Sequence, residues 1–179
     1  MINFNLPQEL IAQHPAIPRD SARLLVYSRK TKTITDALFK DVNKYLPKDS
    51  TLVINNSKVE HCRWLFENGK IEVFVLNKID THTVQAMVRP GKKFKQDDIV
   101  QLGDGIEAKV ISIKDGTRIL KLNVSHDDNM LAAYEHVPLP PYIKQDDSLA
   151  DEYQTVYAKP EGSKAAPTAG LHFTQRLLD

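Results

Sequence analysis

Residues 160–174 form the part of this chain best suited to ligand chemistry. They combine small side chains, two glycines and His172, and they end where a helix is predicted to begin, after Thr174. Small side chains let a ligand approach the backbone closely, and amides at a helix start can receive an anion or a polarised oxygen. A histidine there can act as a general base or hydrogen-bond donor, although a lone histidine is more often structural. The pattern therefore predicts a ligand-binding loop.

A second polar group, Arg19, Asp20, Ser21 and Arg23, precedes the first apolar run of the chain. These side chains can contact an anion or a hydroxyl group of a ligand. They can equally form an internal ion pair that closes the first loop. The residues alone favour neither role.

The densest basic cluster, residues 89–95, has Pro90 and Gly91 near its centre. A basic turn of this kind can contact the phosphates of a nucleic acid. As a pattern alone, a solvated hairpin tip is the more frequent explanation.

The polar turn at residues 55–58 follows a short apolar run, residues 51–54, that is typical of a buried strand. Ligands of open α/β sheets gather at the carboxyl ends of strands, so this turn is well placed to bind one. A simple Asx turn explains the same residues equally well.

Strands and short helices must position these groups. Residues 24–27 and 33–35 predict a β-hairpin, and residues 39–46 predict a helix with one apolar face that ends before Pro47. Short helices are also predicted at residues 7–13 and 127–135. Polar and apolar side chains alternate over residues 71–76, 83–88, 99–102, 106–111 and 118–122. This alternation predicts five short strands of a small barrel or sandwich, inserted between two pieces of an α/β layer.

Composition limits the class of protein. With 179 residues, 41% hydrophobic and 26% charged, the chain can form one ordinary or two small globular domains. Its net charge of +1 neither requires nor excludes a polyanionic partner. The single cysteine, Cys62, excludes an intramolecular disulfide and a thiolate metal cluster. The N-terminus lacks signal-peptide features, and no stretch approaches the ~20 apolar residues that cross a bilayer, so we expect no membrane partner and a cytoplasmic location.

Motifs of the common cofactor and metal sites are missing from the sequence. It contains no Walker loop, dinucleotide glycine motif, nucleophile elbow or zinc-ligand cluster. The six histidines lack metal-ligand spacing, and His14 and His136, each close to prolines, are interpreted as loop residues. Metal-independent chemistry is therefore expected.

Several unusual motifs occur in order along the chain. They are residues 7–15 and 19–26, Val88-Arg89-Pro90-Gly91-Lys92-Lys93, Val137-Pro138-Leu139-Pro140-Pro141-Tyr142-Ile143, and residues 153–158 and 165–174. Together they closely resemble the S-adenosylmethionine:tRNA ribosyltransferase-isomerase family of queuosine biosynthesis. The resemblance covers essentially the whole chain, and because family members are roughly twice as long, the chain resembles their N-terminal half.

The resemblance implies an incomplete α/β layered domain, residues 1–66 and 137–179, with an inserted β-barrel-like domain at residues 67–136, α+β overall. It also implies a reaction. The family transfers and isomerises the ribosyl unit of S-adenosylmethionine, a co-substrate, onto 7-aminomethyl-7-deazaguanine at the tRNA wobble position. The products are epoxyqueuosine, adenine and methionine, and no metal is required. A proton must leave a carbon near the sulfonium, and the attacking amine must be unprotonated.

The match of motifs also implies site residues. His172 is the expected proton-transfer or orienting group. The expected substrate contacts and site-building residues are Arg19, Asp20, Arg23, Asn55, Lys58, Thr168 and Gly170, and the expected contacts to tRNA are Arg89, Lys92 and Lys93.

Three positions depart from the family pattern. Asn56 and Lys58 stand where the family usually has aspartate and arginine, and Lys164 stands where a small apolar residue is usual. Lysine lacks the planar fork with which arginine grips a carboxylate or phosphate, and the change at Asn56 removes a charge. Both changes weaken the expected grip on substrate at this turn.

The chain by itself is expected to fold but to be inactive, because the helix after Thr174 is too short to hold the ligand loop firmly. The competing interpretation is a non-catalytic RNA-binding module that keeps the insert and its basic turn. A third is an expression fragment or an interrupted gene product with no function of its own. The sequence does not determine an oligomeric state.

Overall fold

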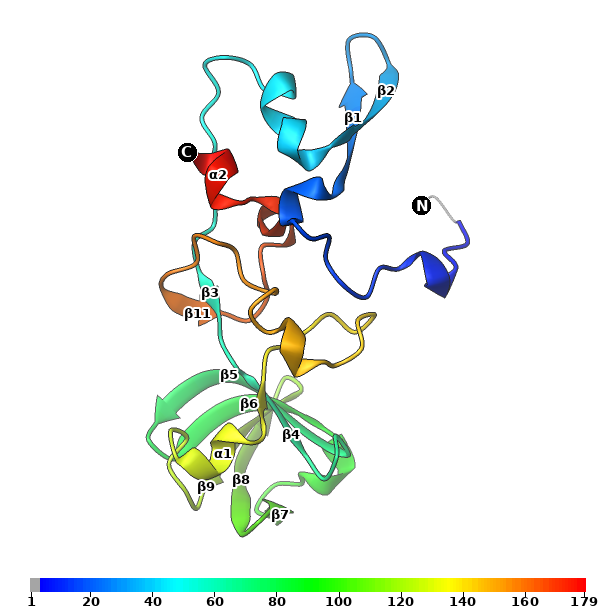
Figure 1. Ribbon diagram of the computed structural model, residues 1–179. Helices are drawn as coiled ribbons and strands as arrows, with labels where there is room; N and C mark the ends of the chain where they lie inside the picture. Colours follow the sequence, from blue (N-terminus) through cyan, green and yellow to red (C-terminus); the bar gives the residue numbers. More distant parts are fainter. Residues whose placement is uncertain (1–3) are drawn as a thin grey trace. The chain divides into compact units, whose positions relative to one another are not determined.

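The chain divides into two compact units, and the second is inserted in the first. The computed structural model describes residues 4–179 (Figure 1). The first unit comprises Met1–Val59 and Leu139–Asp179, and the second comprises Glu60–Pro138. The sequence predicts the first boundary after residue 66, but strand β4 (Arg63–Phe66) pairs with β5 (Ile71–Asp80) and so lies in the second unit. The described residues form an α+β structure in which strands predominate.

The second unit is built on one antiparallel sheet of seven strands in the order β10-β4-β5-β6-β9-β8-β7 (Figure 1). The remaining strands are β6 (Thr83–Arg89), β7 (Ile99–Gly103), β8 (Ile106–Lys114), β9 (Thr117–Leu122) and β10 (Glu135–His136). A 3₁₀ helix, η4 (Gly91–Lys93), and a short helix, α1 (Asn129–Ala132), lie between strands. The structure confirms the five strands that the alternating pattern predicts.

Alternation of side chains gives this sheet one buried face. Along β5, Ile71 and Val73 are 0% exposed and Val75 is 2% exposed, while the residues between them are partly exposed. The same core contains Trp64, Phe66, Phe94, Leu102, Ile106, Leu120 and Leu131. Full burial of such a side chain stabilises a fold by about 1.5–3 kcal/mol, so this cluster is the main source of stability in the second unit.

Tyr134 connects the two edges of this curled sheet. Its ring stacks on Phe66 of β4 with centroids 4.6 Å apart, and its backbone carbonyl accepts a hydrogen bond from Leu65. Its hydroxyl donates to Asp104, in the turn that follows β7, and this hydrogen bond is the main reason that the pKa of Tyr134 is raised. One side chain therefore bridges the β4 side and the β7 side of the sheet.

Two of the hairpin turns have the residues that their geometry requires. Asp104 and Gly105 connect β7 to β8 with φ of 46° and 78°, and Asp115 and Gly116 connect β8 to β9 with φ of 48° and 78°. Positive φ at both central residues matches the twist of the flanking strands, and Asp-Gly tolerates it well. The order of these strands is therefore set locally.

The first unit contains two small sheets and several short helices. Strands β1 (Arg23–Ser28) and β2 (Thr33–Leu38) form the predicted antiparallel hairpin, and β3 (Lys58–Val59) pairs in parallel with β11 (Glu161–Ser163). The helices are η1 (Gln8–Leu10), η2 (Arg19–Ser21), η3 (Phe39–Tyr45), η5 (Asp147–Leu149), η6 (Thr168–His172) and α2 (Gln175–Leu178). The helix predicted at residues 39–46 thus forms as a 3₁₀ helix. No helix in the described part of the chain is long and apolar enough to cross a membrane.

The prediction of a buried strand at residues 51–54 is wrong. Within residues 4–179 no strand pairs with this segment, and Leu52, Val53 and Ile54 are 52%, 88% and 42% exposed. An apolar run forms a strand only when a neighbouring strand takes up its backbone hydrogen-bonding groups. The described residues offer no such neighbour.

Candidate functional site

The first unit contains a cavity of about 260 Å³ with walls from several separate segments. The lining residues with polar or charged side chains are Gln13, His14, Arg19, Tyr142, Glu152, Tyr153, Thr168 and His172. The other walls are alanine, proline, leucine and isoleucine. A mostly apolar cavity with a few convergent polar groups is typical of a small-molecule site.

Three of the residues expected from the sequence meet in this cavity. Arg19 comes from η2, and Thr168 and His172 come from the two ends of η6. The segments that hold them are far apart in the chain, so the folding of the first unit brings them together. This grouping makes the cavity the candidate site.

Arg19 holds one wall of the cavity in place. Its Nη1 donates to the carbonyl oxygen of Gln154, and its Nη2 donates to that of Asp151 at 3.1 Å. Glu152 and Tyr153, which lie between these two carbonyls, both line the cavity. Arg19 therefore positions this wall in addition to facing the cavity itself.

Asp20 is buried and forms an internal ion pair. It is 1% exposed, and its Oδ2 accepts hydrogen bonds from the Thr174 hydroxyl at 3.2 Å and from Arg176 Nη2 at 2.6 Å. Both donors follow η6 directly. The helix α2 begins after Thr174, as predicted, and Thr174 is its N-cap residue, but its side chain makes no capping bond and donates to Asp20 instead.

His172 is oriented by aromatic packing. Its ring lies 5.1 Å from that of Phe39, centroid to centroid. Phe173 packs edge-on against the Phe39 ring, with ring centroids 5.0 Å apart. The Phe173 ring also packs against that of Tyr157, with centroids 6.4 Å apart. An imidazole held in this way can present a nitrogen to the cavity in a fixed direction, which proton transfer requires.

Gly170 allows close packing at the middle of η6. A Cβ at this position would overlap the hydroxyl of Tyr157 and would lie 3.1 Å from Thr155 Cγ2. Gly170 itself does not line the cavity, so its role in this structure is to let η6 pack closely. The ligand contact that the resemblance implies for Gly170 is not part of this cavity.

The other expected substrate residues lie outside the cavity lining. Arg23 pairs with Asp36 at 3.9 Å, and both side chains are mostly exposed. Asn55 accepts hydrogen bonds from the Ser57 amide at 2.9 Å and hydroxyl at 2.7 Å, which is the simple Asx turn. Lys58 Nζ lies 3.8 Å from Glu161. The structure groups none of these three with His172.

Sequence reasoning missed His14, Glu152 and Tyr153, which all line the cavity. Burial raises the pKa of Tyr153, opposed by a backbone hydrogen bond with Ala166, so its phenol stays a neutral donor near pH 7. His14 stands in a proline-rich loop, a setting that by itself favours a structural role. The only sequence signal for His14 and Tyr153 is their place inside the motifs at residues 7–15 and 153–158, and Glu152 lies next to the second of these.

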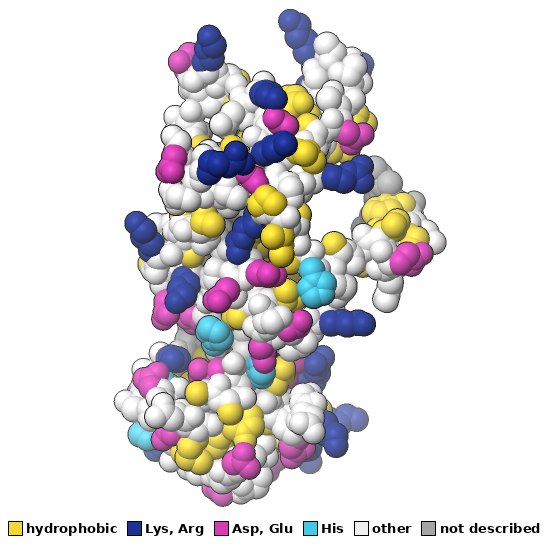
Figure 2. Space-filling view, viewed as in Figure 1, with side chains coloured by type: hydrophobic (Ala, Val, Ile, Leu, Met, Phe, Trp, Pro, Cys, Tyr) yellow, Lys and Arg dark blue, Asp and Glu magenta, His cyan; other side chains and the backbone are white. Residues whose placement is uncertain are grey.

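Two of the three expected tRNA contacts are already paired with acids. Arg89 Nη2 lies 2.9 Å from Glu72 Oε2, and Lys93 Nζ lies 3.6 Å from Glu67 Oε2. Basic and acidic side chains are also interspersed over the face seen in Figure 2, in keeping with the net charge of +1. The basic turn therefore has less free positive charge than its sequence suggests.

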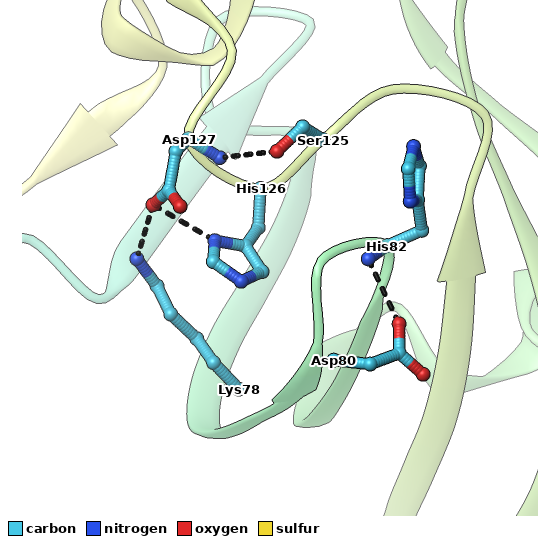
Figure 3. Close-up of polar contacts among 6 residues, drawn as sticks. All are labelled: Lys78, Asp80, His82, Ser125, His126 and Asp127. Atoms are coloured by element: carbon cyan, nitrogen blue, oxygen red, sulfur yellow. Dashed lines mark hydrogen bonds and ion pairs between the residues drawn. The ribbon is translucent and has the colours of Figure 1, made fainter.

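Two aspartates of the second unit make the contacts drawn beside its histidines in Figure 3. Asp127 accepts a hydrogen bond from Lys78 Nζ at 3.1 Å and lies 2.9 Å from His126 Nδ1, and both contacts lower its pKa, that of Lys78 most. Asp80 accepts the backbone N–H of His82 at 2.9 Å. Among the described residues no three His, Cys, Asp or Glu side chains are grouped as metal ligands would be.

The chain is similar to known proteins over nearly its whole length. The family model described as "Queuosine biosynthesis protein" matches residues 1–179. The S-adenosylmethionine:tRNA ribosyltransferase-isomerase of Sulfurihydrogenibium sp. (strain YO3AOP1) is 42% identical over 183 residues, 99% of this chain and 54% of that protein. The protein of the same name from Thermosipho africanus (strain TCF52B) is 45% identical over 184 residues, 99% of this chain and 53% of that protein.

A solved structure is also similar in sequence. The crystal structure of S-adenosylmethionine tRNA ribosyltransferase from Thermotoga maritima is 32% identical, with a TM-score of 0.37 over 98% of this chain and 51% of that one. The chain spans about half the length of the relatives it matches. Because the family model covers every residue and the identities exceed 40%, the chain belongs to the queuosine biosynthesis protein family.

Proposed function

We propose that this chain is the substrate-binding part of an S-adenosylmethionine:tRNA ribosyltransferase-isomerase. The reaction transfers and isomerises the ribosyl unit of S-adenosylmethionine onto 7-aminomethyl-7-deazaguanine at the tRNA wobble position, giving epoxyqueuosine. The single observation that carries this proposal is the meeting of Arg19, Thr168 and His172 in one cavity of the first unit. The names of the relatives agree with it.

The cavity suits the nucleoside part of S-adenosylmethionine. Its apolar walls can cover a flat ring. Polar groups of the ligand can be oriented by the Thr168 hydroxyl, the Tyr153 phenol and the imidazoles of His14 and His172. His172 is the proposed proton-transfer or orienting residue, because one nitrogen of an imidazole can donate a hydrogen bond while the other accepts one, and its ring is fixed against Phe39. Arg19 is proposed as both a substrate contact and the residue that positions the 151–154 wall.

The first unit is proposed to be part of an α/β layer, and the second an inserted β-barrel-like domain that contacts tRNA. Its curled sheet and the basic turn with Arg89, Lys92 and Lys93 support the second role. Replacing these three residues by alanine should weaken tRNA binding and lower its salt dependence. The slope of log affinity against log salt concentration should become less negative by about 0.9 for each phosphate that the protein no longer neutralises.

Isothermal titration of S-adenosylmethionine into the purified chain tests the cavity assignment. The wild-type chain should bind, and His172→Ala and Thr168→Ala should bind more weakly. His82→Ala is the matched control, because it removes a histidine from a turn of the second unit. Equal binding by His172→Ala, Thr168→Ala and the control would contradict the assignment.

Adenine release measures the activity itself. With precursor-bearing tRNA, the chain alone should bind S-adenosylmethionine without releasing adenine, since it spans only about half the length of the relatives it matches. Turnover by the purified chain would show that residues 1–179 suffice for catalysis. RNA binding without any binding of S-adenosylmethionine would favour the non-catalytic RNA-binding module instead.

A further inference from the structure

Arg118 lies on the inner face of the second unit's sheet, among apolar side chains. On β9 it pairs with Ala86 of β6, and two residues further on Leu120 pairs with Val84. Ala86, Val84 and Leu120 are all 0% exposed. Paired residues of neighbouring strands project to the same face, so the side chain of Arg118 starts on the buried side at one end of β9.

The guanidinium of Arg118 is incompletely paired. Its Nη1 donates to the carbonyl oxygen of Gly116 at 2.8 Å. Its Nε is buried and has no hydrogen-bond partner within residues 4–179. A ligand cannot reach the buried Nε, but Arg118 as a whole is partly exposed, so the outer nitrogens of its guanidinium can donate to an anion.

The Nη2 atom of Arg118 lies beside the basic turn. A Cβ added to Gly91 would lie 3.4 Å from Arg118 Nη2, so the guanidinium is next to the backbone of η4. Arg89 and Lys93 are ion-paired with Glu72 and Glu67. Within residues 4–179 no ion pair with an acid is found for Arg118 or Lys92, nor for Lys95 of the same cluster, and of the three Arg118 alone carries a guanidinium.

We propose that Arg118, with Lys92, binds a phosphate of the tRNA backbone beside Gly91. The inference deepens the proposed function and rests on it for the identity of the RNA. A guanidinium can donate two parallel hydrogen bonds to one phosphate, which a lysine cannot do. Arg118 is distant in sequence from the basic turn, and the sheet brings it there.

The test is binding of an unmodified tRNA transcript by fluorescence anisotropy between about 50 and 200 mM KCl. Arg118→Met keeps the length and apolar stem of the side chain and removes its charge. For Arg118→Met, we expect the slope of log affinity against log salt concentration to become less negative by about 0.9, equally for transcripts of different sequence. The thermal unfolding midpoint of Arg118→Met should equal or exceed that of the wild-type chain, because the substitution removes a buried unpaired N–H.

Lys121→Met is the matched control, since Lys121 is an exposed cation on the same strand; it should leave the slope unchanged. Arg118→Gln gives the same measurement if Arg118→Met does not fold. Wild-type binding with an unchanged slope in the Arg118 variant overturns this inference alone. Absence of salt-dependent RNA binding by the wild-type chain overturns the proposed tRNA contact, and this inference with it.

Discussion

Asp20 and Arg176 form an ion pair across 156 residues of sequence, with Arg176 Nη2 2.6 Å from Asp20 Oδ2. The Asp20 side chain is 2% exposed, whereas that of Arg176 is 76% exposed. The Thr174 hydroxyl donates to the same carboxylate oxygen. One buried carboxylate therefore attaches the residues after η6 to η2, the helix from which Arg19 reaches the cavity.

Asp20→Asn should lower the free energy of unfolding of the first unit by about 1.5 kcal/mol, because charge-assisted hydrogen bonds to Asp20 are removed while Arg176 can be hydrated. Urea denaturation measures the change. Asp36→Asn is the matched control, since its pair with Arg23 is exposed and 3.9 Å long, and it should have no measurable effect. Equal effects of the two substitutions would contradict the structural role of Asp20.

Gly170→Ala should destabilise the first unit by about 1–3 kcal/mol, because the added Cβ overlaps the Tyr157 hydroxyl. Tyr157→Phe removes that hydroxyl and should partly restore stability in the double variant. Thermal unfolding of the two single variants and the double variant gives the coupling. Simple additivity of the two changes would show that the two side chains do not meet as described.

The same substitution should have different effects at two valines. Val75→Ala should cost about 2 kcal/mol of stability, because Val75 is 2% exposed in the core of the second unit. Val53→Ala should change stability by less than about 0.5 kcal/mol, because Val53 is 88% exposed. Chemical denaturation monitors both. A large loss of stability in Val53→Ala would mean that residues 51–54 are buried in solution.

Glu135 should make stability depend on pH. Burial raises the pKa of this half-buried carboxyl above its ordinary value, opposed by Lys78 and by a hydrogen bond from Trp64. A folded-state pKa above the unfolded value means that the folded state binds the proton more tightly. Protonation of Glu135 therefore stabilises the folded state. This stabilisation is complete below the unfolded pKa and is lost as pH rises through the folded pKa.

Glu135→Gln cannot titrate, so it should gain stability relative to the wild type as pH rises from about 4 to about 7. Urea denaturation of both proteins at the two pH values gives the difference between them. The prediction is wrong if the free energy of unfolding of the wild type rises relative to that of the variant over this pH range.

Much of the second unit could be predicted from sequence alone. The alternation over residues 71–122 predicts β5 to β9, and the structure has these strands. Most of them pair with a neighbour in the chain through a short turn, so local pattern and local pairing agree. The strand prediction at residues 51–54 was wrong because a strand there needs a partner strand that the neighbouring sequence does not supply.

The sequence by itself determined the family, through motifs that occur in order, and it pointed to His172, Thr168 and Arg19. Tertiary structure alone decided that these three share a cavity with His14 and Tyr153. The sequence left open whether Asp20 contacts a ligand or forms an internal ion pair, and the structure pairs it with Arg176. Residue types and spacing carry propensity and chemistry, but contacts between distant segments depend on how the whole chain packs, so local pattern could not place them.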